Sequence, residues 1–360
     1  MKLMICGGGT GGHVYPGVAV AREFNARGVG NHTVFVGTES GLEFTIIPKE
    51  GFPLEIVRAG SWTGKSIGKK VLTLFTLPLG IIQAMGILKK HHPDFVLGVG
   101  GYVSVPLMMA SLLMKYPTYL HEQNAIPGLA NRLLARWVDA VFLSYPESET
   151  HFSSIRTVFT GNPVRPEFFV DLGKSSASQK GPMVLAFGGS RGASSLNRAW
   201  IEALPMLKKK AGDAYFVLQT GEREFETVKQ TFVDSGMSGE VHPFIGNMPD
   251  FLGSANLVIS RAGASTVAEI TAAGKASVLI PYPFAANDHQ TKNAESLQSA
   301  GAAVVIPDKD LNGKRLSEAV LSLLHDPDRL TGMSKAASRL GQPDAAKRIV
   351  DTWVQPGDKN

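Results

Sequence analysis

Two glycine-rich segments with the same pattern constrain the fold of this chain most. The first, "CGGGTGGHVYPG" at residues 6–17, packs five glycines into the six residues that precede its histidine. A shift of 180 residues lays Gly8 on Gly188, within a second segment, "MVLAFGGSRGASSLN" at residues 183–197. An apolar run comes before each set of glycines and a helical pattern comes after it, as in a strand, a tight turn and a helix. The repeat therefore predicts two Rossmann-like domains, each opening on a glycine loop.

Apolar runs alternate with helical stretches along both halves of the chain. The first half holds "LMIC", "TVFVG", "DFVLGVGGY", "PTYLHEQN" and "AVFLS", and the second holds "AYFVLQTG", "LVISRAG" and "ASVLIPYP". This alternation is typical of doubly wound parallel sheets, so the predicted fold class is α/β. We expect the two domains to span residues 1–162 and 163–341, with a C-terminal helix in 342–360 that completes the first domain.

Cysteine content and net charge narrow the class of protein. The single cysteine, Cys6, excludes an intrachain disulfide and a cysteine-based zinc site, and it is typical of a reducing cytoplasm. The apolar start at Met1–Cys6 is too short for the core of a signal peptide, so we expect no secretion. A net charge of +5 and a pI near 9.1 favour an anionic partner, which nucleic acid, acidic lipid and phosphorylated ligands would all satisfy.

One basic window contains a long uncharged segment. Residues 56–93 hold no acid, and residues 71–88, "VLTLFTLPLGIIQAMGIL", hold no charge at all. Because Pro78 interrupts this segment, we expect two short helices that meet there instead of a membrane span. The helices could be a buried pair, or a peripheral membrane patch with apolar side chains in the lipid and lysines at anionic headgroups. The patch would comprise Leu72, Phe75, Leu79, Ile82, Lys69, Lys70, Lys89 and Lys90.

The first glycine loop has two readings. It contains G-x-G-x-x-G at Gly7, Gly9 and Gly12, which is a dinucleotide-binding pattern and leaves a nicotinamide oxidoreductase open. However, the sequence departs from that pattern in two ways. The acidic residue expected about 20 residues after the glycines is further along, since Glu39 lies about 27 residues after Gly12, and His13 stands where the helix begins. Bare backbone at a helix N-terminus also suits other phosphates, because its N–H groups and dipole favour negative charge.

Two features of the second half suggest a nucleotide. In "SRAGASTVAE" a turn of small residues follows a strand, and Glu269 lies one helical turn beyond Ser265. The turn could face a diphosphate while the carboxylate accepts hydrogen bonds from a ribose. A structural alternative is that Glu269 only complements the helix dipole.

Asp308 and Asp310 form a D-x-D pair after a strand, which leaves a metal site as a minor alternative.

Seven motifs in one order resemble a known family. They are "GGGTGGHVYPG", "GVGGYVSVP", "HEQNAIPG", "GNPVR", "FGGSRGA", "SRAGASTVAE" and "NDHQTKNAE". Together they resemble the UDP-N-acetylglucosamine–N-acetylmuramyl-(pentapeptide) pyrophosphoryl-undecaprenol N-acetylglucosamine transferases, the MurG family, from residue 3 to about residue 350. The resemblance implies a two-domain GT-B glycosyltransferase with its active site between the domains. It would move N-acetylglucosamine, with inversion, from UDP to the 4-hydroxyl of the muramic acid of lipid I, forming lipid II without a metal or other cofactor.

The resemblance also implies roles for individual residues. The donor would lie mainly on the second domain, and the pyrophosphate of the acceptor would meet the first glycine loop. His13 would be the general base, with Glu122 and Tyr102 as the other groups that could act. The chain departs from the family at His289, where a glutamine is common. The implied contacts are Phe244 and the backbone of Ile245 to uracil, Glu269 to ribose, Ser190, Ala264, Ser265 and Thr266 to diphosphate, Arg165, Asn124, Gln290 and Asn293 to the sugar, and Thr10, Gly11 and Gly12 to the acceptor.

The implied partners are a lipid and a membrane surface, and no nucleic acid. A prenyl tail keeps lipid I in the bilayer, which favours the peripheral patch and a place on the cytoplasmic face of the bacterial plasma membrane. Cell-wall synthesis and division proteins are further expected partners. Two alternatives to the transferase stay open besides the oxidoreductase: a UDP-sugar epimerase of the same fold, and a non-catalytic membrane scaffold.

Overall fold

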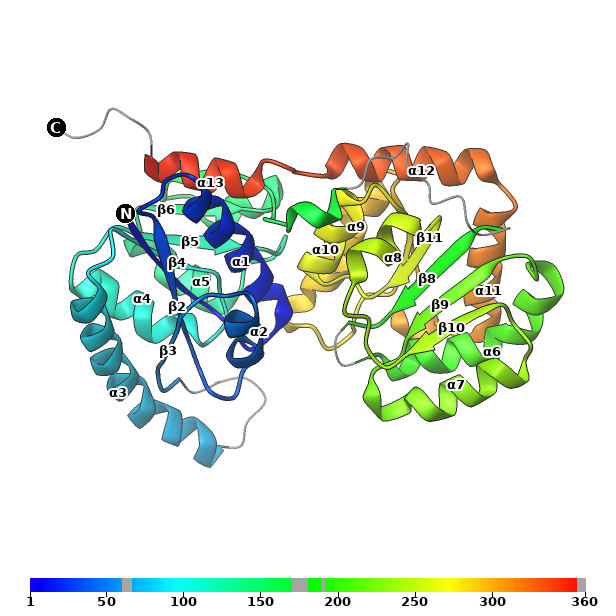
Figure 1. The fold of residues 1–360 in the computed structure, drawn as a ribbon, viewed down its shortest axis with the longest axis horizontal. Helices are drawn as coiled ribbons and strands as arrows, with labels where there is room; N and C mark the ends of the chain where they lie inside the picture. Colours follow the sequence, from blue (N-terminus) through cyan, green and yellow to red (C-terminus); the bar gives the residue numbers. More distant parts are fainter. Residues whose placement is uncertain (60–66, 170–180, 190–191, 355–360) are drawn as a thin grey trace. The chain divides into compact units, whose positions relative to one another are not determined.

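The chain divides into two compact units. The computed structural model describes residues 1–59, 67–169, 181–189 and 192–354, and for residues 67–75 and 354 it describes the backbone alone (Figure 1). Unit 1 comprises Met1–Arg165 and Gln342–Asn360, and unit 2 comprises Pro166–Gly341. The sequence pattern predicts the first boundary after residue 162, and the structure places it after Arg165.

Unit 1 is built on a parallel sheet. Its described residues form seven strands in the order β3-β2-β1-β4-β5-β6-β7. The strands are β1 (Lys2–Cys6), β2 (His32–Gly37), β3 (Leu54–Ile56), β4 (Phe95–Gly98), β5 (Thr118–Glu122), β6 (Ala140–Leu143) and β7 (Thr157–Phe159). The α-helices are α1 (Gly11–Ala26), α2 (Glu43–Lys49), α3 (Ile67–His91), α4 (Ser104–Leu113), α5 (Leu129–Leu134) and α13 (Ala345–Val354).

Strand β1 shows how the sheet of unit 1 is buried on both faces. Because side chains alternate along a strand, Leu3 and Ile5 enter one core and Met4 and Cys6 enter the other. The first core is shared with α1 and α13, and the second with α3 and α4. The ring of Trp353 in α13 stacks on Phe95, with centroids 5.6 Å apart. The C-terminal helix is therefore part of the core of unit 1.

Helix α3 is one continuous helix, so the prediction of two helices that meet at Pro78 was wrong. A proline inside a helix removes one backbone donor and costs about 3 kcal/mol. The turns after it are anchored, since Ala84, Ile87 and Leu88 are buried in the core of unit 1. Gly80 lies against the backbone of Arg58, where a Cβ would overlap the carbonyl oxygen. Packing of these turns maintains the helix through the proline.

Unit 2 repeats this architecture. Its described residues form a parallel sheet of six strands in the order β10-β9-β8-β11-β12-β13. The strands are β8 (Met183–Phe187), β9 (Tyr215–Gln219), β10 (Gly239–His242), β11 (Leu257–Ser260), β12 (Ala276–Leu279) and β13 (Ala303–Val305). The α-helices are α6 (Ser194–Lys210), α7 (Phe225–Asp234), α8 (Met248–Ser254), α9 (Ala264–Ala272), α10 (His289–Ser299), α11 (Gly313–Leu324) and α12 (Pro327–Leu340).

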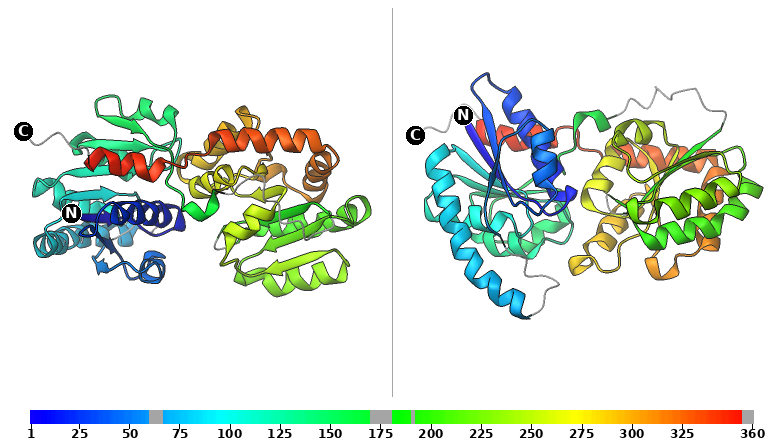
Figure 2. Two further views of the ribbon diagram at one scale, coloured as in Figure 1. Left: turned by 45° about the horizontal axis from the view of Figure 1, so that its top comes forward. Right: turned by 60° about the horizontal axis from the view of Figure 1, so that its bottom comes forward.

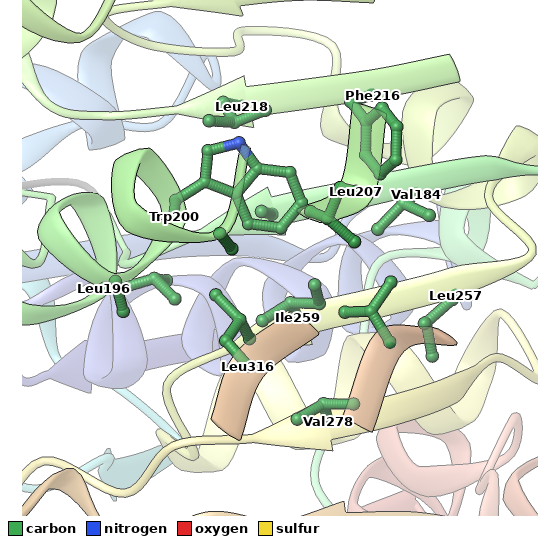
Figure 3. Packing of buried hydrophobic residues seen from close by; sticks show 14 of the residues in the cluster. Val184, Leu196, Trp200, Leu207, Phe216, Leu218, Leu257, Ile259, Val278 and Leu316 are labelled. Atoms are coloured by element: carbon green, nitrogen blue, oxygen red, sulfur yellow. The ribbon is translucent and has the colours of Figure 1, made fainter. Parts of the chain in front are cut away.

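The core of unit 2 is centred on a buried tryptophan. Trp200 of α6 lies over the sheet beside Leu218 and Phe216 of β9 (Figure 3). The rings of Trp200 and Phe216 meet edge to face, with centroids 5.6 Å apart. Figure 2 shows from two further sides that helices cover the sheet within each unit.

The strand order places both glycine loops at equivalent points. In each unit the chain runs outward from a central strand, β1 or β8, and then continues on its other side with β4 or β11. Ligands of such sheets bind beyond the carboxyl ends of the strands at this switch point. The predicted fold class, two Rossmann-like parallel-sheet domains, is confirmed. The short strands β3, β7 and β10 were not predicted.

Candidate functional site

The glycine loop of unit 1 connects the end of β1 to the start of α1. Gly9 has φ +84°, a conformation that favours glycine, and a Cβ on Gly7 would overlap the side chain of Val99. Thr10 is the N-cap of α1, so Gly11 and Gly12 occupy the first turn at the positive end of a 16-residue helix. Tyr102 lies beside the loop, since its ring would be 3.6 Å from a Cβ on Gly9.

His13 follows in the same turn and is hydrogen-bonded to a residue that sequence reasoning missed. Its Nδ1 lies 3.2 Å from Oε1 of Gln123, which comes directly after β5. The ring is bordered by Gly100 and Gly101, both with positive φ, and a Cβ on Gly100 would lie 3.1 Å from it. The motif "HEQN" contains Gln123, but nothing in its pattern indicates which side chain faces His13.

Glu122 organises the loop after β5. Its buried carboxylate accepts hydrogen bonds from the backbone N–H and the side-chain amide of Asn124, at 3.0 and 3.2 Å. It also accepts from the N–H of Gly128 at 3.0 Å and from Nδ2 of Asn131 at 2.8 Å. Four donors on one carboxylate assign Glu122 to holding Asn124 and this loop in place.

Arg165 lies in unit 1. Its guanidinium is 4.6 Å from the ring centroid of Tyr15, a cation–π distance, and its Nη1 is 3.9 Å from Oε1 of Glu50. The side chain is mostly buried, and these contacts tie it to Tyr15 of α1 and to Glu50, which directly follows α2.

The glycine loop of unit 2 follows β8. Gly189 and Gly192 have φ of +89° and +75°, and Ser190 lies outside the described residues. Gln219 was not predicted but joins two parts of the site. Its Nε2 donates to the carbonyl of Gly189 at 3.0 Å, and its Oε1 accepts from the N–H of Ile245 at 2.8 Å. The side chain of Phe244, beside this contact, is 53% exposed.

The turn after β11 is held in place by two side chains of α10. Gly263 is the N-cap of α9, so Ala264, Ser265 and Thr266 form its first turn and Glu269 the next. Gln290 accepts from the N–H of Ala262 at 3.2 Å, and Asn293 donates to the carbonyl of Ala262 at 3.2 Å. The side chain of Asn293 is fully buried, which makes it a support of the turn. His289 is partly exposed, and its Nδ1 lies 2.6 Å from the carbonyl oxygen of Ala286.

Asp308 of the D-x-D pair is bound by an arginine. Its Oδ1 lies 2.6 Å from Nη1 of Arg261, and it accepts from Oγ of Ser195 at 2.7 Å. Arg261 also donates to the carbonyls of Ile280 and Pro281. No group of three His, Cys, Asp or Glu side chains suited to a metal ion occurs in the described part of the chain.

The predicted membrane patch is described in part. Leu79 and Ile82 are 48% and 64% exposed on α3, and Lys89 and Lys90 are exposed at its end. The side chains of Lys69, Lys70, Leu72 and Phe75 lie outside the described part. Across the described residues, no helix combines the length and hydrophobicity that crossing a bilayer requires.

Comparisons with known proteins cover both units. The glycosyltransferase family 28 N-terminal domain matches residues 3–143, and the C-terminal domain of that family matches residues 183–349. The UDP-N-acetylglucosamine–N-acetylmuramyl-(pentapeptide) pyrophosphoryl-undecaprenol N-acetylglucosamine transferase of Geobacter sulfurreducens is 44% identical over 98% of each chain.

Two solved structures resemble this one. The MurG crystal structure from Acinetobacter baumannii covers 98% of both chains with a TM-score of 0.78 and 30% identity. A UDP-GlcNAc 2-epimerase from Neisseria meningitidis shares the fold alone, with a TM-score of 0.70 and 14% identity. With 44% identity over 98% of its length, the chain belongs to the UDP-N-acetylglucosamine–N-acetylmuramyl-(pentapeptide) pyrophosphoryl-undecaprenol N-acetylglucosamine transferases of glycosyltransferase family 28.

Proposed function

We propose that this chain transfers N-acetylglucosamine from UDP-N-acetylglucosamine to the 4-hydroxyl of the N-acetylmuramic acid of lipid I, giving lipid II and UDP. The observation that carries the proposal is 44% identity over 98% of both chains with a transferase of that name. The epimerase alternative has weaker support, because its solved relative is 14% identical. The oxidoreductase alternative leaves the second glycine loop without a role.

The donor would bind to unit 2. The exposed ring of Phe244 would stack on uracil, and the carbonyl oxygen of Ile245 would accept from its N3–H, because the N–H of Ile245 is donated to Gln219. Glu269 would accept from the ribose hydroxyls. The diphosphate would lie at the first turn of α9, at Ala264, Ser265 and Thr266, with Ser190. These N-terminal amides would stabilise the charge that develops on the departing UDP.

The acceptor would bind to unit 1. Its pyrophosphate would meet Thr10, Gly11 and Gly12 at the start of α1, where the helix dipole favours negative charge. Asn124, held by Glu122, and Arg165, held by Tyr15, would contact the transferred sugar with Gln290 of unit 2. Asn293 would support the sugar site indirectly, because its side chain donates a hydrogen bond to the carbonyl of Ala262 and so fixes that turn.

His13 would take the proton of the acceptor hydroxyl. The O4 oxygen attacks C1 of N-acetylglucosamine as the bond from C1 to UDP breaks, and the proton of O4 passes to the imidazole. General-base catalysis is worth about 10²–10⁴ in rate, so His13→Ala should lower kcat by that factor. UDP binding should be unchanged in this variant, and it should weaken in Phe244→Ala and Glu269→Ala.

The peripheral patch of α3 would hold the enzyme at the cytoplasmic face of the plasma membrane. Leu79 and Ile82 would enter the lipid while Lys89 and Lys90 meet anionic headgroups, each worth about 1 kcal/mol. Cell-wall synthesis and division proteins are proposed partners at the same surface.

A substrate panel tests the proposal. UDP release would be measured from UDP-N-acetylglucosamine with and without a water-soluble lipid I analogue. We expect release only with the acceptor, in step with formation of the disaccharide. Interconversion of the UDP-sugar without an acceptor would instead establish the epimerase, and thermal stabilisation by NADH but not UDP would establish the oxidoreductase.

A further inference from the structure

A chain of buried hydrogen bonds lies behind His13 in unit 1. Oε1 of Gln123 is 3.2 Å from Nδ1 of His13, and Nε2 of Gln123 is 3.0 Å from Nδ1 of His121. Nε2 of His121 is in turn 3.3 Å from the carbonyl of Gly161 and 3.3 Å from Oγ of Ser144. Gln123 is 1% exposed and His121 is fully buried. None of the roles assigned above uses Gln123.

The orientation of the Gln123 amide is determined by its neighbours. Its Nε2 lies 2.8 Å from the carbonyl of Val99 and 3.3 Å from the carbonyl of His121. A carbonyl oxygen only accepts, so the end of the amide that faces these two oxygens must be the NH₂ group. The other end, which faces His13, is therefore the amide oxygen.

An amide oxygen facing Nδ1 decides where His13 carries its proton. Since that oxygen cannot donate, Nδ1 must hold the hydrogen, and the lone pair of the neutral ring is then on Nε2. We infer that Gln123 is a positioning residue that holds neutral His13 in the Nδ1–H tautomer, so that Nε2 accepts the proton of the acceptor hydroxyl. The tautomer follows from the geometry, whereas its use in catalysis rests on the function proposed above.

The other end of this series of hydrogen bonds, at His121, is consistent with this assignment. Burial lowers the pKa of His121 to about 4, so the ring is neutral near pH 7. It accepts from Gln123 at Nδ1 and so carries its hydrogen on Nε2, which donates to Gly161. The series of hydrogen bonds thus ends on the backbone carbonyls of Val99 and Gly161.

A neutral orienting group has a consequence for the base. A carboxylate at this place would stabilise the positively charged imidazolium form of the ring. The amide of Gln123 orients the ring without adding charge. The closely approaching backbone of Gly100 and Gly101 limits the space in which the ring could turn, so packing and hydrogen bonding favour the same orientation.

Nitrogen NMR of the full chain labelled with ¹⁵N-histidine tests the tautomer without reference to activity. Long-range ¹H–¹⁵N spectra above pH 7 distinguish a protonated ring nitrogen from one with a lone pair, and His13→Asn identifies the His13 signals. We expect a protonated Nδ1 in the wild type and a loss of that preference in Gln123→Met, which is similar in size but has no amide. A wild-type ring protonated on Nε2, or no change in Gln123→Met, would overturn the inference.

Kinetics then test the use of this tautomer. Gln123→Met should lower kcat by about tenfold or more, with the KM for UDP-N-acetylglucosamine within about twofold. In a His13→Ala background the same change should have no further effect on kcat, because it acts through His13. An equal loss in both backgrounds would refute the catalytic role. Ser111→Ala, which removes a buried hydroxyl where α4 ends, is the control for folding. If His13→Ala alone retains wild-type kcat, the proposed base fails while the NMR result stands.

Discussion

The carboxylate of Glu43 accepts a hydrogen bond from the backbone N–H of Gly9 at 2.8 Å, across 34 residues of sequence. Its other oxygen accepts from the N–H and the hydroxyl of Thr38, at 3.0 and 2.8 Å. The side chain is buried, and a Cβ on Gly8 or Gly41 would overlap it. Glu43 therefore holds the glycine loop of unit 1 from within.

Replacing Glu43 with glutamine should disturb this loop. One end of the amide is a donor and would face donors on Gly9 or Thr38, so we expect the free energy of unfolding to fall by about 1–3 kcal/mol. The KM for the lipid I analogue should rise more than the KM for UDP-N-acetylglucosamine. Urea titration and steady-state kinetics measure both. Glu23→Gln, at a partly exposed partner of Arg27, is the matched control and should change stability by less than about 1 kcal/mol. Equal behaviour of the two variants would contradict a special role for Glu43.

Asp308 should be important for stability and Asp310 should not. Asp308→Asn leaves the guanidinium of Arg261 without its carboxylate, which costs up to about 3 kcal/mol, since both side chains keep some exposure. Asp310 is exposed, so Asp310→Asn is the control in the same urea titration. Because Asp308 is engaged by Arg261 and Ser195, we also expect transferase activity to survive EDTA. Loss of activity in EDTA with rescue by Mn²⁺ would restore the D-x-D alternative.

Serine at positions 79 and 82 should weaken binding to vesicles of acidic phospholipid. Leu79 and Ile82 are exposed on α3, and burial of such a side chain in lipid is worth about 1.5–3 kcal/mol, so each change should reduce affinity by about ten- to a hundredfold. Activity on a water-soluble acceptor should be retained. Val233→Ser removes an equally exposed side chain, 62% exposed on α7, and should leave vesicle binding unchanged. The membrane proposal fails if all three variants bind vesicles like the wild type.

His121 should make the stability of the protein depend on pH between about 6.5 and 4. Burial lowers its pKa to about 4 from an ordinary value of 6.5, so in this range the unfolded chain binds a proton that the folded chain does not. Above pH 6.5 the free energy of unfolding does not depend on this titration. As the pH falls from 6.5 toward 4, the free energy of unfolding decreases by about 3 kcal/mol in all.

Urea titrations from pH 4.5 to pH 7.5 measure this dependence. His121→Gln should flatten the slope of unfolding free energy against pH. His151→Gln, which changes an exposed histidine, should keep the wild-type slope. The same slope in both variants would show that His121 is not the titrating group.

Much of the fold could be predicted from local patterns. The long central strands are buried on both faces, so they read as apolar runs. The glycine loops that follow β1 and β8 are also visible in the sequence, and Gly9, Gly189 and Gly192 have the positive φ that favours glycine. The family could be predicted too, since its motifs are short and occur in order. The edge strands β3 and β7 have three residues each, too few to show a period.

The contacts that support the candidate site were decided by tertiary structure. Gln123 meets His13 across 110 residues, and Asp308 meets Arg261 across 47. Parallel strands bring distant segments to one edge of a sheet, and a buried polar group must find its partner there, because leaving it unpaired costs free energy. Residue type and local spacing can therefore indicate which side chains are chemically able to act. Only the packed sheet determines which of them meet, and which proton, charge or loop each one holds.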